Sequence, residues 1–137
     1  MENQSLKTSV RMALLMGIFL PLAETLRRSN QLLDPARFLN WFDDYLLGGA
    51  MLLAVYSVRK KKRNAVGWLI AVWGIGVGAL FLSFIGQFDY YKTPTGDPGI
   101  FNTTIVAIVK GLILAYMFYG LYLSVKANEA GASVRKK

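Results

Sequence analysis

The stretch Arg59-Lys60-Lys61-Lys62-Arg63 places five consecutive cations between two apolar segments. No charged residue occurs from Tyr45 to Val58 on one side, or over the 24 residues from Ala65 to Phe88 on the other. An apolar helix of about 20 residues spans the roughly 30 Å hydrocarbon core of a bilayer. Two such helices joined by a short basic loop are typical of a transmembrane hairpin whose loop is cytoplasmic. We therefore predict that the five cations contact anionic lipid headgroups of the bilayer, and we expect no nucleic-acid partner.

The composition favours a membrane protein and narrows its chemistry. Of the 137 residues 54% are hydrophobic, the formal net charge is +8 and the mean hydropathy is +0.36. A soluble domain of this length cannot bury so much apolar surface, whereas lipid can cover it. The chain has no Cys and no His, which excludes disulfides, His-ligated zinc or haem, and every catalytic triad that depends on His. We therefore expect no cofactor, no metal site and no enzyme activity.

These observations predict an all-α fold, namely an integral membrane four-helix bundle that forms a single transmembrane domain over 1–137. We expect four transmembrane helices at about 9–28, 35–59, 65–88 and 98–126, with a basic cytoplasmic loop at 59–64 and an outer loop at 89–97. Asp-Pro pairs at 34–35 and 97–98 favour helix starts, because Asp caps free backbone N–H groups and Pro suits the first helical position. The first segment is also similar to a signal peptide with Ala23 at its cleavage point, so whether it is retained or cleaved stays open.

The distribution of cations predicts the orientation of these helices. Eleven lie on one predicted side, and they are Lys7, Arg11, the five of 59–63, Lys126, Arg135, Lys136 and Lys137. The other side carries Arg27, Arg28, Arg37 and Lys92. Because cytoplasmic loops carry the excess of Lys and Arg, both termini are predicted to be cytoplasmic. From the small size and the lack of targeting signals we expect the cytoplasmic (inner) membrane of a bacterium.

Small residues recur at helical spacing on the third and fourth predicted helices. Gly74 and Gly78 form one pair, and Ala107, Gly111 and Ala115 form a second stripe. Small residues four apart let a neighbouring helix approach closely in a membrane. The pattern fits packing within the chain, and it also fits contact with another subunit or a second copy.

Four ionisable residues are predicted to lie at one depth inside the outer leaflet, and these are Glu24, Asp43, Asp44 and Lys110. The helical rise of 1.5 Å per residue places Asp43, Asp44 and Lys110 roughly 7–9 Å below the outer boundary. Glu24 falls in the same layer, and Gln87 is near it at the end of the third helix. Charges at this depth are costly and mark functional sites by default. One hypothesis is structural, with Lys110 paired to a carboxylate. The other is a polar pocket for a small ligand, an ion or a proton, because one Lys cannot neutralise two carboxylates pointing about 100° apart.

The sequence thus supports two main functional hypotheses. The first is a small non-catalytic membrane protein that packs through its Gly and Ala faces, as an accessory or structural subunit or as a homo-oligomer. The second is a small transporter, channel or ligand-binding membrane protein that uses the charged pocket, with proton coupling as one version, because a carboxylate without a partner in low dielectric favours its protonated form.

Overall fold

The structure, a computed structural model, describes residues 4–31, 34, 36 and 39–135. The described part is all-helical. Its elements are α1 (Gln4–Arg27), the 3-10 turn η1 (Ser29–Gln31), α2 (Leu39–Arg59), α3 (Ala65–Gln87), the 3-10 turn η3 (Phe88–Lys92) and α4 (Thr103–Arg135). Three stretches, Gln4–Arg27, Ala65–Lys92 and Thr103–Ala132, are long and apolar enough to cross a membrane. The chain is thus an all-helical protein with three candidate membrane spans.

The helix bounds differ from the predicted ones mainly at the fourth helix. The predicted start at Pro98 is not where α4 begins; it starts at Thr103 and continues past 126 to Arg135. The side chain of Asn102 caps it by accepting a hydrogen bond from the backbone N–H of Thr104, at 2.8 Å. The first helix starts at Gln4 rather than near residue 9. The predicted start of the second helix at Pro35 lies outside the described residues, and α2 is described from Leu39.

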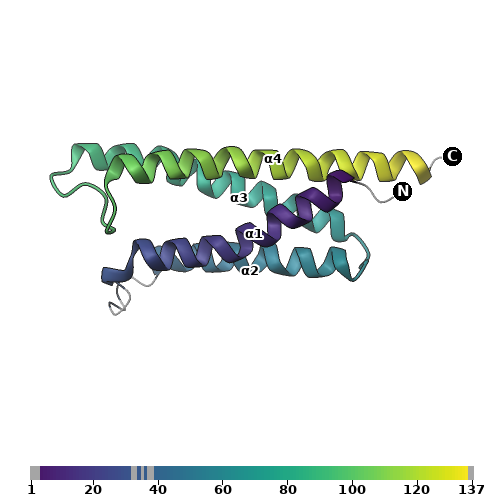
Figure 1. Ribbon diagram of the computed structural model, residues 1–137, viewed down its shortest axis with the longest axis horizontal. Coiled ribbons are helices and arrows are strands. Elements are labelled where there is room, and N and C mark those ends of the chain that lie inside the picture. Colours follow the sequence, from purple (N-terminus) through teal and green to yellow (C-terminus); the bar gives the residue numbers. More distant parts are fainter. Residues whose placement is uncertain (1–3, 32–33, 35, 37–38, 136–137) are drawn as a thin grey trace.

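The four helices form two antiparallel pairs. α1 packs on α2 and α3 packs on α4, while contacts of α2 with α3 and of α1 with α4 close the bundle. Figure 1 shows α1 and α3 crossing each other between α2 and α4, and the two pairs lying apart at the end where α1 meets α2 and α3 meets α4. The turn between α2 and α3, the start of α1 and the end of α4 lie together at the other end, which we call the basic end because it carries the 59–63 cluster. The loop between η3 and α4 lies at the opposite end.

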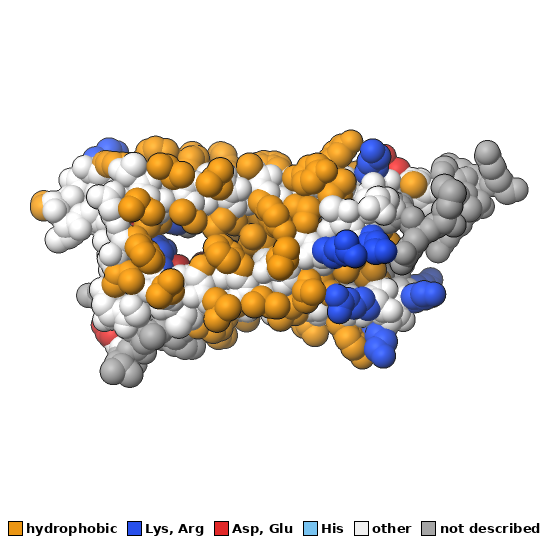
Figure 2. Space-filling model, in the orientation of Figure 1, with side chains coloured by type: hydrophobic (Ala, Val, Ile, Leu, Met, Phe, Trp, Pro, Cys, Tyr) orange, Lys and Arg blue, Asp and Glu red, His pale blue; other side chains and the backbone are white. Residues whose placement is uncertain are grey.

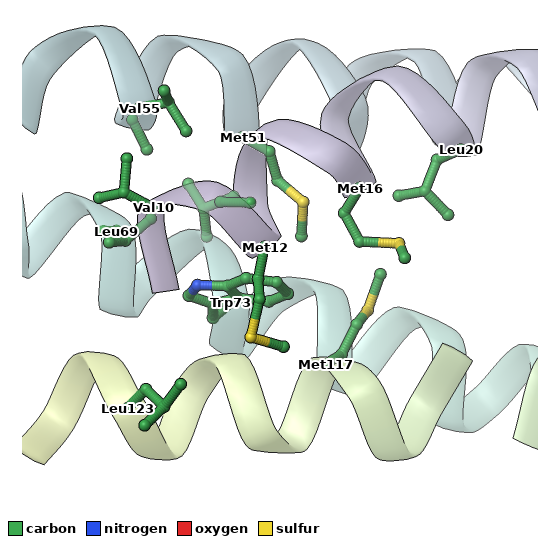
Figure 3. Close-up of a cluster of buried hydrophobic side chains, with 13 residues drawn as sticks. Val10, Met12, Met16, Leu20, Met51, Val55, Leu69, Trp73, Met117 and Leu123 are labelled. Atoms are coloured by element: carbon green, nitrogen blue, oxygen red, sulfur yellow. The ribbon is translucent and has the colours of Figure 1, made fainter. Parts of the chain in front are cut away.

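A core drawn from all four helices holds the crossing together. Figure 3 shows it, with α1 contributing Val10, Met12, Met16 and Leu20, α2 Met51 and Val55, α3 Leu69 and Trp73, and α4 Met117 and Leu123. Trp73, at 0% exposure, is the largest fully buried side chain among those that the structure describes. Its indole N–H donates to the hydroxyl of Ser9 at 3.0 Å, and this hydroxyl also lies 2.6 Å from that of Ser124. The three polar groups therefore satisfy one another inside an apolar core.

Glycine allows the helices to approach closely at three positions. A Cβ atom at Gly17 would lie 2.8 Å from the side chain of Leu52, and one at Gly48 would lie 2.8 Å from the backbone oxygen of Gly17. A Cβ atom at Gly120 would lie 2.5 Å from the ring of Trp73. Only glycine fits such contacts without separating the helices.

The glycines and alanines singled out in the sequence differ in their surroundings. A Cβ atom at Gly74 or Gly78 would have no neighbour within 4 Å, so neither packs a helix of this chain. At Gly111 it would lie 3.3 Å from the ring of Phe84, which places Gly111 in the contact between α3 and α4. Ala107 is buried and Ala115 is exposed. Helical spacing predicts that the small residues of each set share a face of their helix. It does not predict whether another helix of this chain packs on that face.

Between its ends the bundle has an apolar surface. Leu82 is 73% exposed and Leu53 is 68% exposed. Figure 2 shows hydrophobic side chains over the length of the face that it displays, with Lys and Arg gathered at the basic end. This distribution fits a protein whose sides are covered by lipid.

Candidate functional site

A cavity of about 500 Å³ lies where the two helix pairs diverge. All four helices line it, mainly with apolar side chains such as Leu20, Leu47, Leu80 and Ile113. Phe19 on α1 and Val109 on α4, each 41% exposed, form part of its rim on the apolar surface. Figure 2 shows a hollow on this face with basic and acidic side chains visible inside it. The site is therefore a partly open apolar chamber with charges at one end.

The last turn of α1 supplies the first part of the charged lining. Glu24, 7% exposed, accepts hydrogen bonds from Arg27 at 3.1 Å and from the Nε of Arg28. The spacings i, i+3 and i, i+4 place both arginines beside the carboxylate on one face of the helix. Glu24 is thereby neutralised by Arg27, the last residue of α1, and by Arg28, the residue that follows the helix, although it is buried.

Asp97 joins the loop between η3 and α4 to this arginine pair. Its carboxylate, which has no exposed side-chain surface, accepts hydrogen bonds from Arg27 Nη2 at 2.7 Å and from Gln87 Nε2 at 2.9 Å. A third bond comes from the backbone N–H of Gly99 at 2.8 Å. Burial alone raises the pKa of Asp97, but these hydrogen bonds outweigh it, so that the pKa lies below its usual value. Asp97 is therefore the ionised centre of a buried network.

Further bonds fasten the same loop to the end of α1. The backbone N–H of Ile100 donates to the carbonyl of Arg27 at 3.0 Å, and the side chain of Gln31 donates to the carbonyl of Pro98 at 2.6 Å. Figure 1 shows this loop reaching from the α3 and α4 pair toward α1 and α2. The loop therefore bridges the two helix pairs at the end where they diverge.

Lys110 enters the network through an amide rather than a carboxylate. Its Nζ donates to Gln87 Oε1 at 2.8 Å and to the carbonyl of Ser83 at 3.2 Å. Gln87, fully buried, thus accepts from Lys110 and donates to Asp97. Within the described part of the chain Lys110 has no direct carboxylate partner, so the simple ion pair considered from the sequence is not formed.

Asp43 and Asp44 on α2 line the same cavity but stand apart from this network. Asp43 is exposed and accepts the backbone N–H of Asp44 at 3.0 Å. The carboxylate of Asp44 is half-buried and has no hydrogen-bond or ion-pair partner among residues 4–31, 34, 36 and 39–135. Asp44 also lines a smaller neighbouring cavity of about 180 Å³, together with Arg28 and Tyr90. Among the described residues, the two aspartates are thus the carboxylates of the site that have no cation partner.

The structure brings together the residues that the depth estimate grouped. Glu24, Asp43, Asp44 and Lys110 all line the large cavity, and Gln87 is bonded to Lys110. The sequence does not predict the pairing of Arg27 with Asp97, because the Asp-Pro pair at 97–98 is expected to start a helix. Their pairing joins residues 70 positions apart. The Pro- and Gly-rich loop gave no sequence signal that Asp97 would turn inward.

Within the described residues no group of three His, Cys, Asp or Glu side chains could hold a metal ion. Comparison of the chain with protein-family models, with curated proteins and with solved structures gave no match. The fold and the site therefore define a class: an all-helical protein with three helices able to cross a membrane and a charged inter-helical cavity.

Proposed function

We propose that this chain is a non-catalytic integral membrane protein that binds a small amphipathic molecule in the cavity between its two helix pairs, as a ligand-binding or transport protein. The supporting observation is the cavity itself. Its volume of about 500 Å³ falls within the range of small-molecule binding sites. Apolar walls with a few convergent polar groups are also typical of such sites. The absence of Cys and His from the sequence leaves no activated nucleophile or imidazole base to support an enzyme.

The proposal includes four membrane crossings, with the basic end in the cytoplasm, in the cytoplasmic membrane of a bacterium. α2 runs antiparallel beside α1, which is itself long and apolar enough to cross. A helix that packs along a membrane span occupies the same depth, so α2 crosses with it. The cavity then lies in the outer half of the bilayer, and its apolar rim opens toward acyl chains, from which an amphiphile can enter.

Equilibrium binding to protein in lipid nanodiscs tests this function. The probes are three compounds of related shape and different charge, namely tetraphenylphosphonium, triphenylphosphine oxide and tetraphenylborate. We expect saturable binding of at least one probe above that of empty nanodiscs. Val109→Trp places an indole at the rim of the cavity and should abolish this binding. Ile108→Trp, one residue away on the lipid-facing side, is the matched control. Absence of saturable binding, or equal binding by both variants, would contradict the proposal.

A second function is favoured by the uncovered small face of α3. Gly74 and Gly78 are exposed and have open space around them, although a small-xxx-small pair usually receives another helix in a membrane. On this proposal the protein is an accessory subunit or a homo-oligomer that docks through α3. Gly78→Leu should then release the partner or dissociate the oligomer on gel filtration in mild detergent. A wild-type protein that is a lone monomer would contradict this alternative.

A further inference from the structure

The charges around the cavity do not balance. The carboxylates that line it or bond its arginine are Glu24, Asp43, Asp44 and Asp97, whereas the cations are Arg27, Arg28 and Lys110. Formally four negative charges face three positive ones, but Asp43 is exposed and its charge is solvated. The half-buried Asp44 lines the cavity with no cation bonded to its carboxylate among the described residues, so the site has a place for one positive charge beside Asp44.

The hydrogen bonds locate this missing charge. Arg27 is matched by Glu24 and Asp97, and Arg28 by Glu24. The ammonium of Lys110 is held by the amide of Gln87 and a carbonyl. One nitrogen of the network, Arg27 Nε, is buried without an acceptor, but the positive charge of that guanidinium is already matched by two carboxylates. The carboxylates without a bonded cation are therefore those of Asp43 and Asp44 on α2, of which Asp44 is the half-buried one.

The walls of the cavity indicate the rest of the ligand. Most of the chamber wall is apolar, with side chains such as Leu20, Leu47 and Leu80. This apolar surface continues to the rim at Phe19 and Val109. A hydrated inorganic cation gains nothing from such walls. An organic cation with an apolar body can instead bury that body while its charge meets Asp44.

From these observations we infer that the ligand of this site is a lipophilic organic monocation, such as an amine or a quaternary onium ion, and that Asp44, assisted by Asp43, is its counter-ion. This inference rests on the proposed function. A monocation gives the carboxylate of Asp44 a charge partner, and its apolar body fits the apolar chamber that Asp44 lines. The network of Glu24, Arg27 and Asp97 holds the end of the chamber in shape and does not contact the charge of the ligand.

The three-probe assay separates this inference from the proposed function. The expected order of affinity is tetraphenylphosphonium first, the neutral oxide second and tetraphenylborate last. If none binds, the proposed function fails. If the oxide or the borate binds as tightly as the phosphonium ion, the cavity binds ligands but the inference about their charge is overturned.

Charge variants assign the counter-ion. Asp44→Asn should weaken phosphonium binding on the order of tenfold or more and leave binding of the oxide unchanged, because one partner of a desolvated charge pair is lost. Asp44→Glu keeps the charge and should retain binding. Asp89→Asn, which removes a carboxylate that is exposed and paired with Lys92, is the matched control.

If Asp44→Asn does not fold, Asp43→Asn provides the test, and it should weaken phosphonium binding in the same direction. Unchanged phosphonium binding in the folded Asp43 and Asp44 variants would overturn the inference.

Discussion

At the scale of single residues, the hydroxyl of Ser9 satisfies three polar groups in the middle of the helix crossing. It receives the indole N–H of Trp73, donates to the carbonyl of Gly120 at 3.1 Å and meets the hydroxyl of Ser124. Ser9→Ala would leave the Trp73 N–H buried without an acceptor, so we expect the free energy of unfolding to fall by about 1–3 kcal/mol. Unfolding in mixed micelles, followed by tryptophan fluorescence, measures this change.

The control for Ser9→Ala is Ser29→Ala, which removes an exposed hydroxyl near the other end of the bundle and should leave stability unchanged. A cycle with Trp73→Phe separates the hydrogen bond from other effects. In the Trp73→Phe background the serine substitution should cost less, since no indole N–H is then stranded. Equal costs in both backgrounds would show that Ser9 does not act through Trp73.

The lowered pKa of Asp97 predicts that acid weakens the link between the η3–α4 loop and α1. Its pKa is lowered in the folded protein, because the hydrogen bonds from Arg27 and Gln87 to its carboxylate outweigh its burial. The stability that it contributes is therefore fully present above the unfolded pKa of about 3.9, and it is lost as the pH falls through the lower folded pKa. Asp97→Asn should be less stable than wild type near neutral pH, and this difference should shrink in strong acid.

Unfolding curves at a series of pH values, for wild type and for Asp97→Asn, test the link. Asp89→Asn is the control, because the Asp89 side chain is 74% exposed and its pairing with Lys92 is open to water. We expect its stability to follow wild type at every pH, since such surface pairs contribute little. A stability difference between wild type and Asp97→Asn that stays constant into strong acid would contradict the assignment.

At the scale of the helices, contact between α1 and α2 depends on the absence of side chains at Gly17 and Gly48. A Cβ atom at Gly48 would meet a backbone oxygen of α1 at 2.8 Å, and a backbone atom cannot rotate away. Gly48→Ala should therefore separate the pair and cost about 1–3 kcal/mol of stability. Gly49→Ala, on the same helix, is the matched control, because a Cβ atom at Gly49 has no neighbour within 4 Å and the change improves helix propensity. Thermal unfolding of both variants in detergent measures the contrast; equal losses would refute this role of Gly48.

The same helices illustrate which features the sequence could predict. Long uncharged runs predicted α3, and counting along the helical rise grouped Glu24, Asp44 and Lys110 at one depth, because both arguments need only length and periodicity. The covered glycines could not be predicted, since the face that a helix turns toward its neighbours depends on how the pairs cross. The pairing of Arg27 with Asp97 was equally hidden, because it follows from the path of an irregular loop.

At the scale of the whole molecule, the start of α1, the end of α4 and the α2–α3 turn lie at one end of the bundle, as Figure 1 shows, and the loop between η3 and α4 lies at the other. With this arrangement and four crossings, only two orientations are possible, with either the basic end or the opposite end in the cytoplasm. The eleven cations predicted for one side favour that side as cytoplasmic, since Lys and Arg near the ends of spans resist translocation. A molecule with four crossings must then expose the Asp97 loop, and with it the charged end of the cavity, to the outside.

Single cysteines can map this orientation, because the sequence contains no Cys and offers a clean background. Thr95→Cys lies at an exposed position of the loop between η3 and α4, Lys62→Cys in the basic turn and Glu129→Cys near the end of α4. In intact cells a membrane-impermeant maleimide should label the first variant alone, and after cell lysis it should label all three. Labelling of Lys62→Cys in intact cells would reverse the orientation. Labelling of Lys62→Cys and Glu129→Cys from opposite sides would instead mean that an odd number of the two intervening helices crosses, and the cavity would then not lie within a four-span bundle.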